Sequence, residues 1–294
     1  MADSAGQPQA SAEARPGAGL GLEMDDRHFA DWTQLLEDRT GLFIAPERRS
    51  FLVSGIRARM RETGCPSARE YYRQLTSGGV QAREWSLLID RLTVHETCFF
   101  RHRASMHMVR DELVPAVLEK ERGYLAWSVG CATGEEAYSL AMLIGGCVEA
   151  GGGEQYFGVT GTDISLPSLR QARQGVYINR RLGDIPQELQ DRYCRPVSRT
   201  HFAITPQLRK RVCFAQLNLR DLGRAPMSSV NLIYCQNLLI YYDRDRRSAI
   251  VDRLAEFLRP GGVLILGSGE LLDWRNPNME KVRYPDTLAY RRTN

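Results

Sequence analysis

The pattern of apolar and polar positions divides the chain into a helical first part and an alternating second part. Between about residues 22 and 96, apolar side chains recur at helical spacing, as Phe29, Trp32 and Leu36 do. The predicted helices cover residues 28–40, 46–61, 68–75 and 83–92. We therefore expect a small all-helical N-terminal domain over residues 22–96, followed by a linker segment and helix over residues 97–123.

From Tyr124 onward, short apolar runs of strand character alternate with helical stretches. The predicted strands are residues 124–129, 155–164, 212–217, 230–235 and 263–267, with a turn at 260–262 and a closing hairpin at 279–291. This alternation is typical of a parallel α/β sheet. Residues 174–211 fit it poorly, and we expect a small β insertion at about residues 190–211 within an α/β domain spanning 124–294.

Composition excludes several classes of protein. Residues 1–21 are poor in large apolar side chains and read as a disordered leader. The chain shows no secretory signal and no apolar run long enough to span a bilayer, so we expect it to be cytoplasmic. Seven scattered cysteines without a C-x-x-C pair favour free thiols and predict no metal site. A net charge of only +4 does not indicate nucleic-acid binding.

The turn between the first strand and its helix has the most informative chemistry. Gly130 and Gly134 bracket it in a G-x-x-x-G spacing, and Glu135 and Glu136 begin the helix. Two carboxylates would repel a dinucleotide pyrophosphate, which argues against a nicotinamide oxidoreductase, but they would attract the ammonium and sulfonium of S-adenosylmethionine. An ordinary strand–turn–helix, with acids that merely suit the helix dipole, is the alternative.

Polar residues follow the other strands at what should be one edge of the sheet. Asp163 ends the second strand, where ribose hydroxyls are bound in nucleotide sites of this type. Asn218-Leu219 follows the third strand, and Gln236-Asn237 follows the fourth.

Two further stretches allow two interpretations each. Between the helical domain and the linker helix, Thr97, Phe99-Phe100 and Arg101 present either a hydroxyl, an aromatic wall and a charge to a ligand, or two core phenylalanines and a surface arginine. The second predicted helix carries Arg48, Arg49, Arg57, Arg59 and Arg61. These arginines form either a solvated basic face or a docking surface for an acidic helical partner.

Four linked motifs resemble the CheR family of chemotaxis receptor methyltransferases. They are LTVHETCFFR at residues 92–101, WSVGCATGEEAYSLAM at 127–142, GTDIS at 161–165 and NLIYCQNLLIYYD at 231–243. The resemblance implies a methyltransferase sheet and transfer of methyl from S-adenosylmethionine to glutamates on the cytoplasmic helical domain of chemoreceptors, giving glutamyl methyl esters. It assigns cofactor contacts to His95, Thr97, Arg101, Glu135, Asp163, Asn218, Leu219, Gln236 and Asn237.

The resemblance also places Tyr241 beside the transferred methyl group and assigns receptor recognition to the arginine-rich helix. A carboxylate is already nucleophilic, so we expect no general base, only Arg101 or Tyr241 orienting the attacking group. We expect a monomer, and S-adenosylhomocysteine as product.

The sequence departs from the family pattern at three positions. His95 replaces an asparagine, Gln236 replaces an arginine, and Gly55 stands where an arginine is common. If the missing arginine steers the substrate, its loss implies a different receptor preference. The insertion looks short, so we expect no binding of a receptor tail peptide. A methyltransferase of a related non-chemotaxis pathway and a non-catalytic S-adenosylmethionine-binding adaptor remain alternatives.

Overall fold

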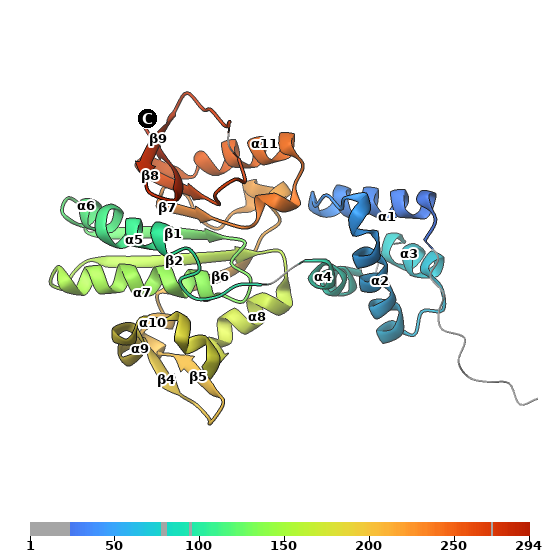
Figure 1. Ribbon diagram of the computed structural model, residues 1–294, viewed down its shortest axis with the longest axis horizontal. Coiled ribbons are helices and arrows are strands. Elements are labelled where there is room, and N and C mark those ends of the chain that lie inside the picture. The colour runs from blue at the N-terminus through green and yellow to red at the C-terminus, as the bar shows by residue number, and fades with distance from the viewer. Residues whose placement is uncertain (1–23, 78–80, 94–95, 272) are drawn as a thin grey trace, which may run out of the picture.

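The computed structural model of the chain describes residues 24–77, 81–93, 96–271 and 273–294 (Figure 1). The predicted leader and His95 lie outside these ranges. None of the described helices is long and apolar enough to cross a bilayer.

The N-terminal domain is helical, as predicted. Its elements are α1 (Asp26–Thr40), η1 (Pro46–Arg48), α2 (Arg49–Thr63), α3 (Ala68–Thr76) and α4 (Gln81–Leu92). Asp25 caps α1 by accepting a hydrogen bond from the His28 N–H, and Gly41 ends it in the left-handed conformation. Phe29, Trp32, Leu52 and other buried side chains form a core separate from that of the sheet.

The linker helix is continuous but irregular. It consists of α5 (Arg103–Met108), one π-helical turn η2 (Val109–Leu113) and α6 (Val114–Leu118), and it leads directly into the first strand.

A seven-stranded sheet in the order β6-β2-β1-β7-β8-β10-β9 forms the second domain. The strands are β1 (Gly123–Val129), β2 (Tyr156–Asp163), β6 (Val212–Gln216), β7 (Val230–Cys235), β8 (Leu258–Leu266), β9 (Met279–Tyr284) and β10 (Thr287–Arg292). The first five are parallel, and β10 is antiparallel to β8 and β9. The predicted turn at 260–262 is wrong, because these residues lie within β8, opposite a register shift between Val230 and Leu232.

Helices cover both faces of the sheet (Figure 1). They are α7 (Glu135–Ala150), α8 (Leu166–Gln174) and α11 (Arg244–Ala255), with 3-10 turns η4 (Leu219–Arg224) and η5 (Leu239–Tyr241). Side chains alternate along β1, so that Tyr124 and Ala126 belong to the core beneath α7 while Trp127 and Val129 belong to the core that includes α11.

The insertion is larger than expected. A second sheet in the order β3-β5-β4 comprises β3 (Val176–Ile178), β4 (Cys194–Pro196) and β5 (His201–Ile204), accompanied by η3 (Asn179–Asp184), α9 (Gln187–Tyr193) and α10 (Pro206–Arg209). It begins at Val176 rather than near residue 190. We predicted that no receptor tail peptide is bound because the insertion looked short. The three-stranded sheet shows that the insertion is not short, so the reason for that prediction no longer holds.

The helical domain lies against the carboxyl ends of the parallel strands. In Figure 1 its helix α4 lies near α8, and these two helices pack together. Asn218 Nδ2 donates to the Arg39 carbonyl at 2.7 Å, and the Phe43 N–H donates to the Tyr241 carbonyl at 2.8 Å. The two domains therefore meet at the edge where the sequence places its polar residues.

Candidate active site

The glycine turn is a tight loop held against the second strand. Gly130, Ala132 and Gly134 all have positive φ angles, of 73°, 45° and 96°. The N–H groups of Gly130 and Cys131 both donate to the Thr162 carbonyl, at 2.8 and 3.0 Å. A Cβ on Gly134 would lie 2.8 Å from Ala172 Cβ, so glycine is required there by packing as well as by conformation.

Two neighbouring cavities lie along the carboxyl edge of the sheet and share Gly130, Ala132 and Asn237. We call the first the inner compartment; its walls include Thr97, Arg101, His102, Glu136 and Gln236. The second, the outer compartment, is lined by Leu42, Thr93, Asp163, Leu219, Tyr241 and other residues. Leu42 belongs to the helical domain and Thr93 directly follows its last helix, so both domains line the cleft.

Of the two acids that begin α7, Glu136 lines the inner compartment and Glu135 does not. Glu136 Oε1 accepts a hydrogen bond from Ser128 Oγ at 2.7 Å, and burial raises the pKa of this carboxyl to about 8. Glu135 is 2% exposed and accepts from Thr133 Oγ1 at 2.6 Å; burial raises its pKa too. The acid placed to meet a cationic ligand in this compartment is therefore Glu136.

An amide and an imidazole complete the inner compartment. Asn237 Nδ2 and His102 Nε2 are 2.6 Å apart, and burial lowers the pKa of His102, which favours the neutral ring as acceptor. Gln236 Nε2 donates to Ser105 Oγ at 3.1 Å, while its Oε1 is buried without a hydrogen-bond partner among the described residues. Gln236 lines the inner compartment, so an ammonium group that reached this oxygen would satisfy it.

The segment before the linker helix divides between core and site. Phe99 and Phe100 are buried in the core, so the interpretation of these rings as a ligand wall is not supported. Thr97 and Arg101 line the inner compartment. Arg101 is exposed and donates from Nη1 to the Glu96 carbonyl at 2.7 Å, which leaves other guanidinium N–H groups for a carboxylate.

Asp163 and Leu219 lie in the outer compartment, whereas Asn218 lines a third cavity beside it, of about 470 Å³, between the domains. Both ends of the Asn218 amide are engaged, since its Oδ1 accepts from the Arg220 N–H and its Nδ2 holds the Arg39 carbonyl. The structure thus gives Asn218 a role in joining the domains.

Tyr241 connects the cleft to the helical domain. It is half-buried in the outer compartment, and the guanidinium carbon of Arg48 lies 5.9 Å from its ring centroid. Burial raises the pKa of Tyr241, with Arg48 and Arg101 opposing the shift.

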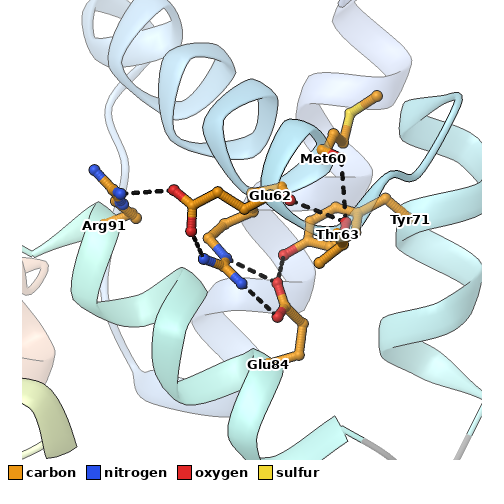
Figure 2. Close-up of polar contacts among 7 residues, drawn as sticks. Met60, Glu62, Thr63, Tyr71, Glu84 and Arg91 are labelled. Carbon is orange, nitrogen blue, oxygen red and sulfur yellow. Dashed lines mark hydrogen bonds and ion pairs between the residues drawn. The ribbon is translucent and has the colours of Figure 1, made fainter.

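The predicted docking arginines differ in exposure and in their partners. Arg57 and Arg61 are exposed, Arg48 and Arg49 are half-buried, and Arg49 pairs with Asp26 at 2.5 Å. The inclusion of Arg59 is corrected by the structure: it is only 6% exposed and makes two hydrogen bonds to Glu84, at 2.9 and 2.7 Å, and one to Glu62 (Figure 2). The positive charge of Arg59 is therefore paired with carboxylates inside the helical domain.

Position 55 is also internal. A Cβ on Gly55 would lie 2.7 Å from Leu92 Cδ2, because α2 and α4 cross closely there. The glycine therefore reflects helix packing, and the inference that it marks a lost substrate-steering arginine is not supported.

Glu136 and His102 are among the residues of the inner compartment that the sequence did not predict as site residues. His102 directly follows the chosen Arg101, and that adjacency was the available signal. No group of three or more His, Cys, Asp or Glu within the described ranges is arranged to hold a metal ion.

The glycine turn, the acid ending β2 and the polar residues after β6 and β7 are the features of an S-adenosylmethionine-dependent methyltransferase. Residues 95–287 match the CheR methyltransferase SAM-binding domain, and residues 27–93 match the CheR methyltransferase all-alpha domain. The chain belongs to the CheR methyltransferase family.

Curated relatives cover most of the chain. It is 26% identical to a chemotaxis protein methyltransferase of Borreliella burgdorferi over 271 residues, which are 90% of this chain and 94% of the relative. It is 29% identical to the chemotaxis protein methyltransferase of Escherichia coli over 252 residues, 85% of this chain and 86% of that one. A relative in Pseudomonas aeruginosa, chemotaxis protein methyltransferase 1, is 28% identical, with 87% and 94% covered.

Proposed function

We propose that this protein transfers the methyl group of S-adenosylmethionine to glutamate side chains on the cytoplasmic helical domain of chemoreceptors. The cofactor supplies a methyl group activated by a sulfonium. A glutamate oxygen attacks that methyl carbon, the carbon–sulfur bond breaks with its electron pair going to sulfur, and a glutamyl methyl ester and S-adenosylhomocysteine result.

Residues of the inner compartment fit the charged end of this cofactor. Glu136 offers a carboxyl group whose ionised form would pair with the positive charge, Gln236 Oε1 offers an acceptor without a partner among the described residues, and Thr97 offers a hydroxyl. Asp163 and Leu219 in the outer compartment suit the ribose and the adenine, a polar and an apolar contact respectively. Glu135 and Asn218 would then act from outside the immediate contact surface.

The observation that carries the proposal is the position of Tyr241 between the cleft and the arginine-rich helix. Arg48 at the start of that helix lies over its ring, and Arg101 lies in the adjoining compartment. A substrate carboxylate arriving along the helix would meet Arg101 and Tyr241 at the point where the compartments join. Orienting it there can supply about 7–11 kcal/mol of the barrier in favourable cases, without a general base.

The exposed surface of α2, of Phe43 and of η5 suits a helical partner with acidic and apolar side chains. Arg57 and Arg61 are exposed, and so are two large apolar side chains, Phe43 at 47% and Ile240 at 53%. Phe43 is bonded through its N–H to the Tyr241 carbonyl. We define Arg48, Arg57, Arg61, Phe43 and Ile240 as the docking surface.

We further propose that the protein acts in the cytoplasm as a monomer. The experiment that tests the function is methyl transfer from radiolabelled S-adenosylmethionine to purified receptor cytoplasmic fragments, with the methylated glutamates intact or replaced by alanine. We expect label that is released as methanol by mild base, as an ester requires, and that disappears with the glutamates. Base-stable label, or label unaffected by the replacements, would contradict glutamate esterification.

A further inference from the structure

A hydrogen bond crosses from the helical domain to the cofactor edge of the sheet. Asp90, near the carboxyl end of α4, accepts a hydrogen bond through Oδ1 from Ser165 Oγ. Ser165 is fully buried, and it is the N-cap of α8, where its Oγ accepts from the Ser168 N–H at 3.1 Å. Ser165 Oγ also lies 3.1 Å from Ser168 Oγ, so this hydroxyl contacts both the helical domain and the first turn of α8.

Ser165 also holds the predicted ribose-binding carboxylate. Its backbone N–H donates to Asp163 Oδ1 at 2.8 Å, and the Ala132 N–H of the glycine turn donates to Asp163 Oδ2 at 2.9 Å. Each oxygen thus has a fixed backbone donor, one from each flanking turn. The orientation of this carboxylate decides how the ribose hydroxyls can reach its oxygens.

We propose that Asp90 is a positioning residue for the cofactor, acting through Ser165 on Asp163. Asp90 fixes the Ser165 hydroxyl, and with it the start of α8 and the 163–165 turn, so that the Asp163 carboxylate points into the outer compartment. The proposal deepens the proposed function, because it rests on the assignment of Asp163 to the ribose. It makes the helical domain a contributor to cofactor affinity without touching the cofactor through this residue.

Hydrogen bonds to charged groups are strong and directional, which suits this role. The contact also lies where α4 and α8 pack together, so the helices hold the two side chains in register. An indirect role of this kind can be distinguished from general destabilisation. Replacing Asp90 should weaken the binding of a ligand that has ribose hydroxyls and should not weaken the binding of a ligand that lacks them.

The test uses calorimetric titration of the full chain with S-adenosylhomocysteine and with its 2′,3′-dideoxy analogue. For Asp90→Ala we expect the dissociation constant of the parent ligand to rise about tenfold, as for the loss of one hydrogen bond to a charged group, while that of the analogue stays within twofold. Asp90→Asn, which keeps an acceptor oxygen, should recover most of the affinity. Asp38→Ala, an exposed aspartate of α1, is the matched control and should change neither constant.

Ser165→Ala provides an independent variant, because it removes the hydroxyl and keeps the N–H that holds Asp163. It should repeat the selective loss. Equal losses for both ligands would show a general structural effect and overturn the proposal, as would unchanged binding in both variants. Equal binding of the two ligands by the unaltered protein would contradict the ribose assignment of Asp163 itself, whereas methyl transfer to the wrong residue type would leave this proposal standing.

Discussion

Glu136 is an acid enclosed by protein beside a cavity suited to a cation. Burial raises its pKa from 4.5 to about 8, and the hydrogen bond from Ser128 opposes the shift only in part. The folded protein therefore keeps a proton on Glu136 between about pH 4.5 and 8 that the unfolded chain releases. That proton links both stability and ligand binding to pH.

Stability should fall as pH rises through this range. The folded state binds more protons than the unfolded state there, so the free energy of unfolding decreases with pH and levels off above about 8. Glu136→Gln cannot lose this proton, and its unfolding free energy from urea titration should decline less between pH 5 and 8. Identical declines in the two proteins would contradict the raised pKa.

Cofactor affinity should change with pH in the opposite direction. Ionised Glu136 attracts the positive charge of S-adenosylmethionine, so the affinity measured by calorimetry should rise from pH 6 to about 8 and then level off. Glu136→Gln should bind more weakly and with a flatter profile. Glu135→Gln is the matched control, since that neighbouring acid does not line the inner compartment; a flattened profile in this control instead would assign the role to Glu135.

The neighbouring acids Glu135 and Glu136 show a feature of the site that the sequence does not predict. Glu135 and Glu136 are about 100° apart around the helix, and the glycine turn decides which one faces the cavity. The amino-acid sequence alone does not predict this rotation of the helix about its axis, because it depends on the packing of Gly134 against Ala172.

At the scale of elements, α2, α3 and α4 are joined by an internal polar network (Figure 2). Arg59 of α2 binds Glu84 of α4 with two hydrogen bonds, and Tyr71 of α3 donates to the same carboxylate at 2.6 Å. Glu62 binds Arg59 and also accepts from Arg91 at 2.7 Å. These contacts raise the pKa of Arg59, and burial beside Glu84 raises that of Tyr71.

Removing one charge from this network should destabilise the helical domain. Arg59→Met leaves the Glu84 carboxylate without its main partner and should cost about 3 kcal/mol in the free energy of unfolding. Arg61→Met, at an exposed position of the same helix, should cost under about 0.5 kcal/mol. Combining Arg59→Met with Glu84→Met should restore part of the loss; a double variant as unstable as the sum of the single changes would argue against a specific pair.

The elements themselves were largely predictable, for reasons that also explain the errors. Long, strongly patterned segments such as 230–235 gave correct strands, because a strand buried along its whole length is a continuous apolar run. The insertion was misjudged because its strands have only three or four residues, too few to show a period. Arg59 lies seven residues after Leu52 on the buried stripe of α2, a visible signal, but its partner Glu84 lies on another helix and no local pattern reveals it.

At the scale of the whole molecule, the cleft is completed where two domains meet. Leu42 and Thr93 line the outer compartment together with Asp163, and Arg48 at the start of α2 lies over the Tyr241 ring. Sequence motifs identified both halves of this arrangement. Their juxtaposition depends on contacts such as Asn218 with the Arg39 carbonyl, which join residues far apart in the chain.

Charge reversal on the docking surface should affect the receptor and not the cofactor. Arg57→Glu with Arg61→Glu should lower kcat/KM for a receptor fragment about tenfold or more, through loss of electrostatic complementarity, and should leave S-adenosylhomocysteine affinity unchanged. The difference should shrink as salt is raised. Arg283→Glu, on the exposed β9, is the matched control; an equal loss there would mean that net charge alone matters.

The single helix α4 has one further consequence. It contacts Arg59 of α2 through Glu84 and Ser165 at the start of α8 through Asp90, so one helix connects the proposed receptor-docking helix with the proposed ribose site. Thermodynamic linkage then requires reciprocity: any factor by which bound cofactor changes receptor affinity is the factor by which bound receptor changes cofactor affinity. A bound receptor fragment would thereby change how tightly the enzyme holds S-adenosylmethionine and S-adenosylhomocysteine.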